Sequence, residues 1–335
     1  MDNVITKKQH YVQQATIISN WSHNGMVGVI GKREQNNFRK EKNKSSKSIF
    51  YQLYGYELFT DFSGMSKHAE NRSSLKSDDN HVFRINDAEK YCKIIEDKAT
   101  PIIKNIINNS AFKYPVETIL EYGDWCKLTD YIALQIIRTP RGRAEYFGYK
   151  EKIKINENTP VEIVDVKFRE NFIYLIQMGV YDQTGIKDDR KLPESYFQIL
   201  SKLLKKSKPK FYFIDNGKEE QFVLGDSPCV MIGSKRVDKF VMPLTPKLLL
   251  EIIPNDSYFW NRKIRREMAT KEKIDKTNCR EYLNSMNKVV YKYDIYNYEN
   301  LKFKLNRAIN NYQNDSNIWT IDKFEKIMTE KEKRL

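Results

Sequence analysis

Apolar residues recur every three or four positions from residue 86 to 106, which is the spacing of one buried helix face, and a second helix with such spacing is predicted from 115 to 138. Pro101 lies inside this pattern and predicts a kink or a break in the helix. Similar spacing recurs at 161–180 and 192–206. Residues 86–206 are therefore predicted to be mainly helical.

Short apolar runs separated by turn residues replace the helical spacing across residues 210–253. This alternation of short apolar runs and turn residues predicts an antiparallel sheet, the main sheet of the protein. Two earlier runs, at 26–30 and 49–54, are separated by a polar and basic stretch. Residues 1–60 are accordingly interpreted as a β-hairpin with a long basic loop.

The C-terminal part, residues 257–332, returns mostly to a helical pattern. Helices are expected at 258–268, 278–286 and 299–311, with a strand at 289–291. Neither an internal repeat nor a Pro/Gly-rich linker divides the chain. The prediction is one α+β domain spanning residues 1–335, with an antiparallel sheet packed against several helices.

Composition adds a strong positive charge to this picture. The chain of 335 residues carries 58 Lys and Arg against 44 Asp and Glu, a net charge of +14. Such a surface attracts polyanions such as nucleic acid or an anionic membrane face. An A+T-rich coding sequence, which favours Lys, Asn, Ile and Tyr codons, would produce a similar excess. The densest cationic stretch, 32–47, holds seven cations and two acids and is expected to be exposed.

The cysteines and the amino terminus limit the class of protein. Four widely separated cysteines form no C-x-x-C pair, which argues against a zinc site and a disulfide scaffold. The first residues contain no apolar signal region, and nowhere do about eighteen apolar residues run together. We therefore expect a cytoplasmic protein with no membrane partner.

Three local groups of residues offer chemistry, and the first is the segment 9–14. His10 is a candidate general base or metal ligand, and the amides of Gln13 and Gln14 are candidates for orienting a substrate. The alternative is that His10 and Tyr11 only anchor the amino terminus through hydrogen bonds.

The second group is the arginine-rich end of the predicted helix at 134–143. Arg138, Arg141 and Arg143 would form a clamp for phosphate or carboxylate, because guanidinium groups bind such anions through two hydrogen bonds. The alternative is favourable charge at a helix C-terminus. Arg138 follows four largely apolar residues and is expected to point inward towards a specific partner.

The third group centres on Asp226, in a turn between two predicted strands. Its carboxylate could hold a divalent metal, orient His10 or pair with Arg138. The alternative is an Asx-turn in which Asp226 accepts hydrogen bonds from its own backbone. Nearby Glu219 and Glu220 do not reproduce the carboxylate and lysine spacing of restriction-like nucleases.

These segments, H-Y-V-Q-Q, L-Q-I-I-R-T-P and G-D-S-P followed by P-L-T-P, resemble the domain of unknown function family 4238. That family carries H-Y-V-P-Q, L-Q-x-x-R-T-P, S-D-N-P and P-L-S-P in the same order. The resemblance covers about residues 7–254. The chain departs from the family pattern at Gln13, Gly225 and Ser227, which leaves open the backbone shape near Gln13 and any role for an amide at 227.

The resemblance implies no particular reaction, but it implies that the three groups share one pocket. The residues matching its signature are His10, Gln14, Arg138, Asp226 and Pro228. The first hypothesis is a metal-dependent nuclease or phosphoesterase acting on nucleic acid or nucleotides, with His10 and Asp226 catalytic and Mg²⁺ or Mn²⁺ on Asp226. Its substrate-binding residues would be Gln13, Gln14, Arg138 and Arg141. The second hypothesis is a non-catalytic module that binds nucleic acid, a nucleotide or a protein partner.

Overall fold

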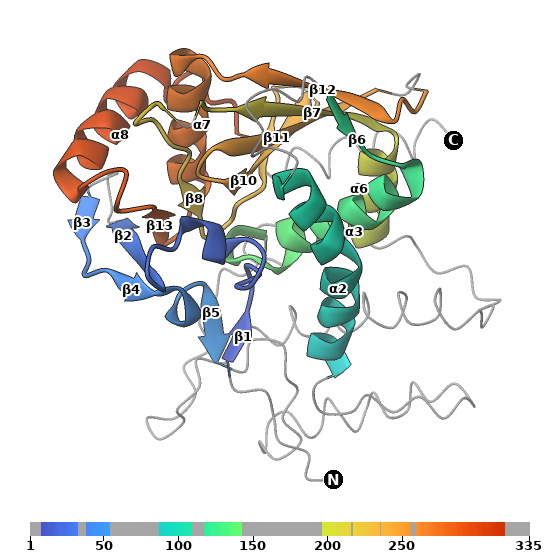
Figure 1. Ribbon diagram of the computed structural model, residues 1–335, viewed down its shortest axis with the longest axis horizontal. Coiled ribbons are helices and arrows are strands. Elements are labelled where there is room, and N and C mark those ends of the chain that lie inside the picture. Colours follow the sequence, from blue (N-terminus) through green and yellow to red (C-terminus); the bar gives the residue numbers. More distant parts are fainter. Residues whose placement is uncertain are drawn as a thin grey trace, which may run out of the picture.

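The computed structural model describes a single α+β domain built from layers of helices and sheets (Figure 1). The residues that it describes are 8–32, 38–53, 87–108, 117–142, 196–215, 217–234, 236–255 and 259–318. The helix predicted at 161–180 lies outside these residues. In the described part of the chain, no helix is long and apolar enough to cross a bilayer.

The largest sheet has six strands in the order β6-β12-β7-β11-β10-β9. Their bounds are Glu117–Ile119 (β6), Lys263–Met268 (β12), Ser207–Phe213 (β7), Leu248–Pro254 (β11), Lys239–Thr245 (β10) and Val230–Ile232 (β9). Neighbouring strands are antiparallel, except that β12 and β7 run parallel. The predicted sheet is confirmed for β7, β11, β10 and β9, and β6 and β12 extend it beyond residues 210–253. The predicted strand that ends at Leu224 belongs to a second sheet instead.

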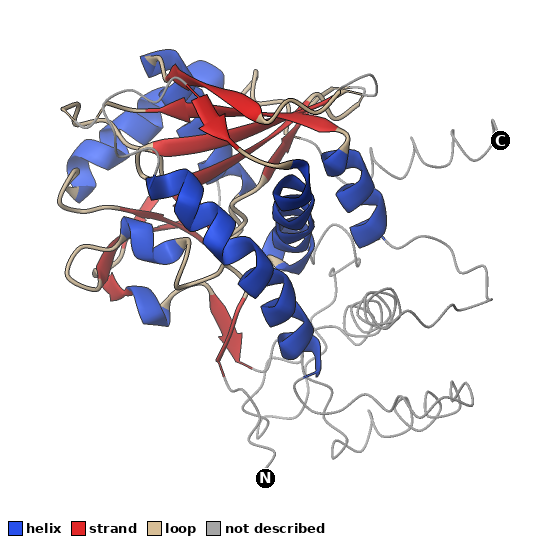
Figure 2. Cartoon of the chain, turned by 45° about the vertical axis from the view of Figure 1, so that its right-hand side comes forward, coloured by secondary structure: helices blue, strands red, loops and turns tan. Residues whose placement is uncertain are grey.

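Alternating side chains of this sheet face two different layers. Met242 and Leu250 belong to the core shared with the helices of one face, whereas Val241 and Leu249 pack with Ile274 on the other face. The helices of the first face are α2 (Asp87–Asn108), α3 (Tyr122–Arg138) and α6 (Tyr196–Lys205), and α7 (Lys271–Asn284) covers the second (Figure 2). The apolar runs of β10 and β11 are therefore explained by burial on both faces.

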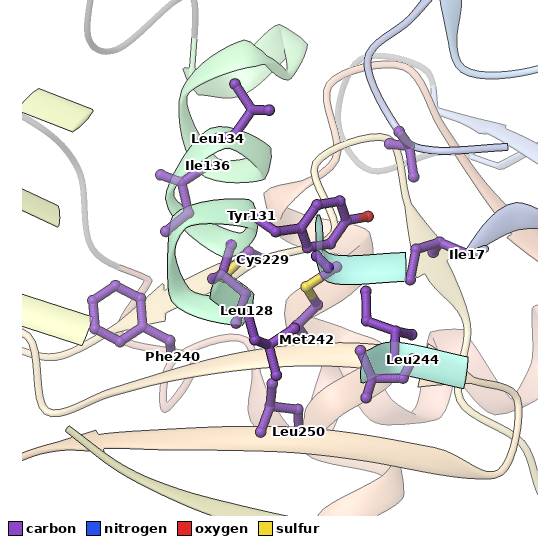
Figure 3. Close-up of a cluster of buried hydrophobic side chains, with 14 of the residues drawn as sticks. Ile17, Leu128, Tyr131, Leu134, Ile136, Cys229, Phe240, Met242, Leu244 and Leu250 are labelled. Carbon is purple, nitrogen blue, oxygen red and sulfur yellow. The ribbon is translucent and has the colours of Figure 1, made fainter. Parts of the chain in front are cut away.

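The core between α3 and the sheet is densely apolar (Figure 3). Leu128 projects from α3 towards Met242 of β10, below which lies Leu250 of β11, and the Tyr131 ring extends from α3 on the side of Ile17. Ile17, from the amino-terminal segment, closes the same cluster beside Tyr131. This segment is thus part of the main core.

A second sheet has the order β3-β2-β13-β8, with β4 also paired to β2. The bounds are Phe38–Lys40 (β3), Met26–Lys32 (β2), Lys288–Tyr291 (β13), Leu224–Gly225 (β8) and Lys44–Ser45 (β4). Its buried Ile30 and Val289 pack with residues of α7 and of α8 (Tyr298–Tyr312). Helix α7 therefore lies against both sheets and connects them.

The predicted amino-terminal hairpin has the right strands but the wrong pairing. Strand β5 (Tyr51–Leu53) pairs with β1 (Lys8–His10), not with β2. The reason is that β3, β4 and β13 occupy the two edges of β2. The 3-10 turns Ile18–Trp21 (η1) and Ser46–Ser48 (η3) complete this region.

The C-terminal helical prediction is partly wrong. Helices α7 and α8 and strand β13 are confirmed, but the helix expected at 258–268 is strand β12 for most of its described length. In the helical region, α2 continues through Pro101 without a break. Its apolar face, with Ala99 and Ile103 fully buried, holds it against the core across the proline.

Candidate functional site

Three of the four signature segments meet around the C-terminal end of α3. The Gln135 amide, oriented so that its nitrogen and its oxygen both find partners, donates to the carbonyl oxygen of Tyr11 at 3.1 Å and accepts from Arg138 Nε at 3.0 Å. The amide nitrogen of Arg141 donates to Ser227 Oγ at 3.2 Å. The L-Q-I-I-R-T-P segment therefore contacts both the amino-terminal segment and the turn that contains Asp226.

The amino-terminal amides bind neighbouring parts of the protein. Gln13 Nε2 donates to Thr100 Oγ1 at 2.9 Å, and Gln14 Nε2 donates to Ser46 Oγ at 3.4 Å. The His10 ring lies 5.8 Å from that of Tyr51, its partner across β1 and β5. These contacts connect the amino-terminal segment to α2, η3 and β5.

Arg138 points into the protein, as its apolar neighbours predict. Its side chain is 1% exposed and forms an ion pair with Glu96 of α2, which is 18% exposed. A buried guanidinium is tolerated because this carboxylate and Gln135 accept its hydrogen bonds. The pair lies beside Tyr131. Burial raises the pKa of Tyr131, and the charge of Arg138 offsets only part of this rise. Arg138 therefore joins α3 to α2.

Asp226 is completely buried, and its carboxylate binds the backbone that leads into β13. Oδ1 accepts from the amide nitrogen of Met286 at 2.8 Å, and Oδ2 accepts from those of Asn287 at 2.8 Å and Lys288 at 3.3 Å. Burial raises its pKa, while these hydrogen bonds oppose the rise. Asp226 therefore accepts backbone hydrogen bonds, as an Asx-turn would require. The donors, however, belong to a segment about sixty residues later in the chain and not to its own turn.

The predicted metal ligands do not fit Mg²⁺ or Mn²⁺. Such ions need several oxygen ligands, and both oxygens of Asp226 are already directed at backbone N–H groups. Within the described residues, no group of three His, Cys, Asp or Glu side chains could hold a metal ion.

A second buried carboxyl group, missed by the sequence analysis, lies next to Asp226. Glu281 of α7 is completely buried, and its Oε2 accepts from the amide nitrogen of Gly225 at 2.9 Å. Its Oε1 has no hydrogen-bond partner among the described residues. Burial and the nearby charge of Asp226 raise the pKa of Glu281 well above 4.5. Glu281 therefore keeps its proton to a higher pH than an exposed glutamate does.

The close approach of α7 explains the glycine at position 225. A Cβ atom there would lie 2.3 Å from Ser285 Oγ and 3.0 Å from Glu281 Oε2. Asn284 Nδ2 also donates to the carbonyl oxygen of Ser227 at 2.7 Å. The whole G-D-S-P turn is therefore fixed to the C-terminal end of α7.

Lys32 holds the same helix end from the other side. Its Nζ donates to the carbonyl oxygens of Tyr282, Leu283 and Ser285 at 2.9–3.2 Å. A cation at a helix C-terminus is favourable because it satisfies the last carbonyl groups. Burial lowers the pKa of Lys32, and the charge of Arg141 lowers it further. Lys32 is thus half-buried, which corrects the expectation of exposure at this end of the basic stretch.

The pH dependence of stability tests the protonation of Glu281. Because its folded pKa lies above its unfolded value, its contribution is complete below about pH 4.5 and is lost as pH rises through the folded pKa. Glu281→Gln removes this titration and keeps an acceptor for Gly225. Between about pH 5 and 8, wild type should lose roughly 1–3 kcal/mol more unfolding free energy than the variant, measured by urea denaturation.

Glu272→Gln on the same helix is the matched control, because Glu272 is 62% exposed and Lys276 lowers its pKa. It should follow the wild-type profile over this pH range. Equal losses in wild type and Glu281→Gln would contradict the assignment.

The basic stretch, apart from Lys32, lies on the surface of the second sheet. Arg39, Lys40, Lys42 and Lys47 are exposed and Lys44 is partly exposed. We call these five side chains the hairpin cations. The expectation of exposure is confirmed for them, whereas residues 33–37 and Arg143 lie outside the described residues.

Comparison with known proteins agrees with the resemblance noted in the sequence. The model of the family described as "Protein of unknown function (DUF4238)" matches residues 8–294, from β1 to beyond β13. No curated protein and no solved structure matches the chain. The matched region contains all four signature segments together with α7, which binds the Asp226 turn. The chain therefore belongs to the DUF4238 family.

Proposed function

We propose that this protein is a non-catalytic nucleic-acid-binding module and that the hairpin cations form its binding surface. The observation that carries the proposal is the charge of this surface. Residues 38–47 hold five cations and one acid, Glu41, on β3, on β4, on the segment between these strands and in η3. Phosphate groups of a nucleic acid would neutralise this excess.

Glu41 does not cancel the charge around it. Its side chain is 8% exposed and is shared by Arg39 and by Lys44, whose Nζ lies 2.7 Å from Glu41 Oε2. Burial alone would raise the pKa of Glu41, but hydrogen bonds from Lys44 and Arg39 outweigh it, so the pKa is lowered. The Glu41 carboxylate thus binds two of the five hairpin cations, and the surface that they form keeps a net positive charge.

Strand pairing holds the patch in a fixed shape. Arg39 lies opposite Gly31, and Lys44 lies opposite Val27, both on β2. Lys40 Nζ lies over the ring of Tyr298, 5.2 Å from its centre. A prearranged set of cations loses less side-chain entropy on binding phosphates than mobile lysines would.

The geometry supports binding better than hydrolysis. Both oxygens of Asp226 accept backbone hydrogen bonds, and Arg138 is held by Glu96. These contacts give the nuclease hypothesis no support, because its metal ligand and its anion clamp are engaged within the protein. The hairpin cations face outward instead.

Loss of three hairpin cations should weaken binding. We expect Lys40→Ala/Lys42→Ala/Lys47→Ala to bind labelled DNA and RNA of about 20 nucleotides at least about ten-fold more weakly than wild type, by fluorescence anisotropy. Arg39 and Lys44 are retained because they hold Glu41. Adding Mg²⁺ or Mn²⁺ to the same samples monitors cleavage in parallel.

The matched control removes the same charge from α2, where Lys93, Lys98 and Lys104 are exposed. Their triple alanine variant should bind within about two-fold of wild type. Equal weakening by the two triple variants would show that only net charge matters. Cleavage by wild type that survives in the hairpin variant would contradict a non-catalytic role.

A further inference from the structure

A second surface, distant in sequence from the hairpin cations, combines exposed aromatic rings with cations. It lies where β6, the amino-terminal end of α3 and the chain entering β12 come together. Phe259 is 90% exposed and Tyr122 is 48% exposed, both unusual for such large side chains. We call Tyr122, Phe259 and the half-buried Trp260 the aromatic platform.

The Trp260 ring of the aromatic platform packs against side chains of α3. The Trp260 ring stacks on buried Trp125 of α3, with centres 5.7 Å apart and planes at 24°, and lies 5.5 Å from the Tyr122 ring. The amide nitrogen of Leu120 donates to the carbonyl oxygen of Arg262 at 2.8 Å, joining β6 to the chain after Trp260. The rings of Tyr122 and Trp260 are therefore held against α3, and Phe259 precedes Trp260 in the chain.

Cations follow the aromatic residues directly in the sequence. The side chains of Arg262, Lys263 and Arg265 are 65%, 59% and 77% exposed. Lys263 and Arg265 share the outward face of β12, because Ile264 between them is buried. We call these three the platform cations.

Carboxylates lie near the platform cations without holding them. Glu121, Glu117 and Glu267 approach them at 3.7–3.8 Å, longer than a hydrogen bond. Exposed ion pairs of this kind are weak, so phosphate groups can displace them. The platform cations are thus available to a polyanion.

We propose that the aromatic platform stacks unpaired bases while the platform cations contact the adjoining phosphates, so that this surface binds single-stranded nucleic acid. This inference rests on the proposed function and adds a preference for single strands. Duplex DNA conceals the faces of its bases, whereas a single strand offers them to aromatic side chains. Cations alone would instead favour the more highly charged duplex.

The test compares Phe259→Ala/Tyr122→Ala with wild type, using an oligothymidine of about 20 nucleotides and a duplex of the same length. We expect the variant to lose at least about ten-fold in affinity for the oligothymidine and less than about two-fold for the duplex. Phe303→Ala on α8, which removes a 66% exposed aromatic side chain elsewhere, is the control and should bind both as wild type does.

The outcomes separate this inference from the proposed function. Unchanged oligothymidine binding in the platform variant would overturn the inference, and the proposed function stands if the hairpin variant still binds more weakly. Weakening by the platform variant alone would support the platform and contradict the hairpin surface. A wild-type protein that binds neither probe overturns both. Thermal unfolding of each variant shows whether it has folded.

Discussion

Asp226→Ala should lower the free energy of unfolding by about 3–5 kcal/mol. The carboxylate accepts three backbone hydrogen bonds at the entry to β13, and it is completely buried. Alanine leaves the three N–H groups without the acceptor that satisfies them in the folded protein, and each group left unsatisfied is costly. Urea denaturation followed by circular dichroism measures the loss.

Asp215→Ala is the control for this prediction. Asp215 is an exposed turn aspartate whose Oδ1 accepts one hydrogen bond, from the amide nitrogen of Gly217 at 3.0 Å. Its removal should cost less than about 1 kcal/mol, because water replaces the lost acceptor. If Asp226→Ala unfolds at the wild-type urea concentration, the structural role of Asp226 is wrong.

Arg138→Ala should destabilise the protein by a similar amount, about 3–5 kcal/mol, the cost of breaking a buried ion pair. The substitution leaves Glu96 without its guanidinium partner and removes a donor to Gln135. Glu96→Ala should also destabilise strongly, since it leaves the arginine charge buried. Because each single change breaks the same pair, the double variant should be clearly more stable than the sum of the two losses predicts.

An exposed pair on the same helix provides the comparison. Lys127 Nζ lies 2.9 Å from Asp124 Oδ1, with side chains 49% and 42% exposed. Lys127→Ala should cost less than about 1 kcal/mol. Strictly additive losses for Arg138→Ala and Glu96→Ala would contradict a direct energetic link between α2 and α3.

The hydrophobic pattern predicted most of the fold because most core positions are apolar. The pattern did not predict β12. Side chains of this strand do alternate between exposed and buried positions, but an arginine occupies one of the buried positions. Arg266 is 5% exposed, binds Thr118 Oγ1 through Nε and donates to the carbonyl oxygen of Ile106 at 3.0 Å. A pattern that counts only apolar residues cannot detect such a strand.

The sequence singled out Arg138 and Asp226 but not the partners that these side chains bind. The apolar neighbours of Arg138 indicate burial, yet its carboxylate partner lies 42 residues earlier in the chain. The targets of Asp226 lie 60 to 62 residues later. Glu281 gives no signal in the sequence, because its burial depends on the glycine at 225 and the turn that packs against α7. Such distant contacts need the fold itself.

The salt dependence of binding tests most directly the claim that the hairpin cations bind nucleic acid. For a duplex, the logarithm of the binding constant falls with the logarithm of salt concentration by about 0.9 for each neutralised phosphate. Lys40→Ala/Lys42→Ala/Lys47→Ala should therefore show a slope shallower than that of wild type by about two to three, while the triple variant on α2 keeps the wild-type slope. Identical slopes for wild type and the hairpin variant would contradict the proposal.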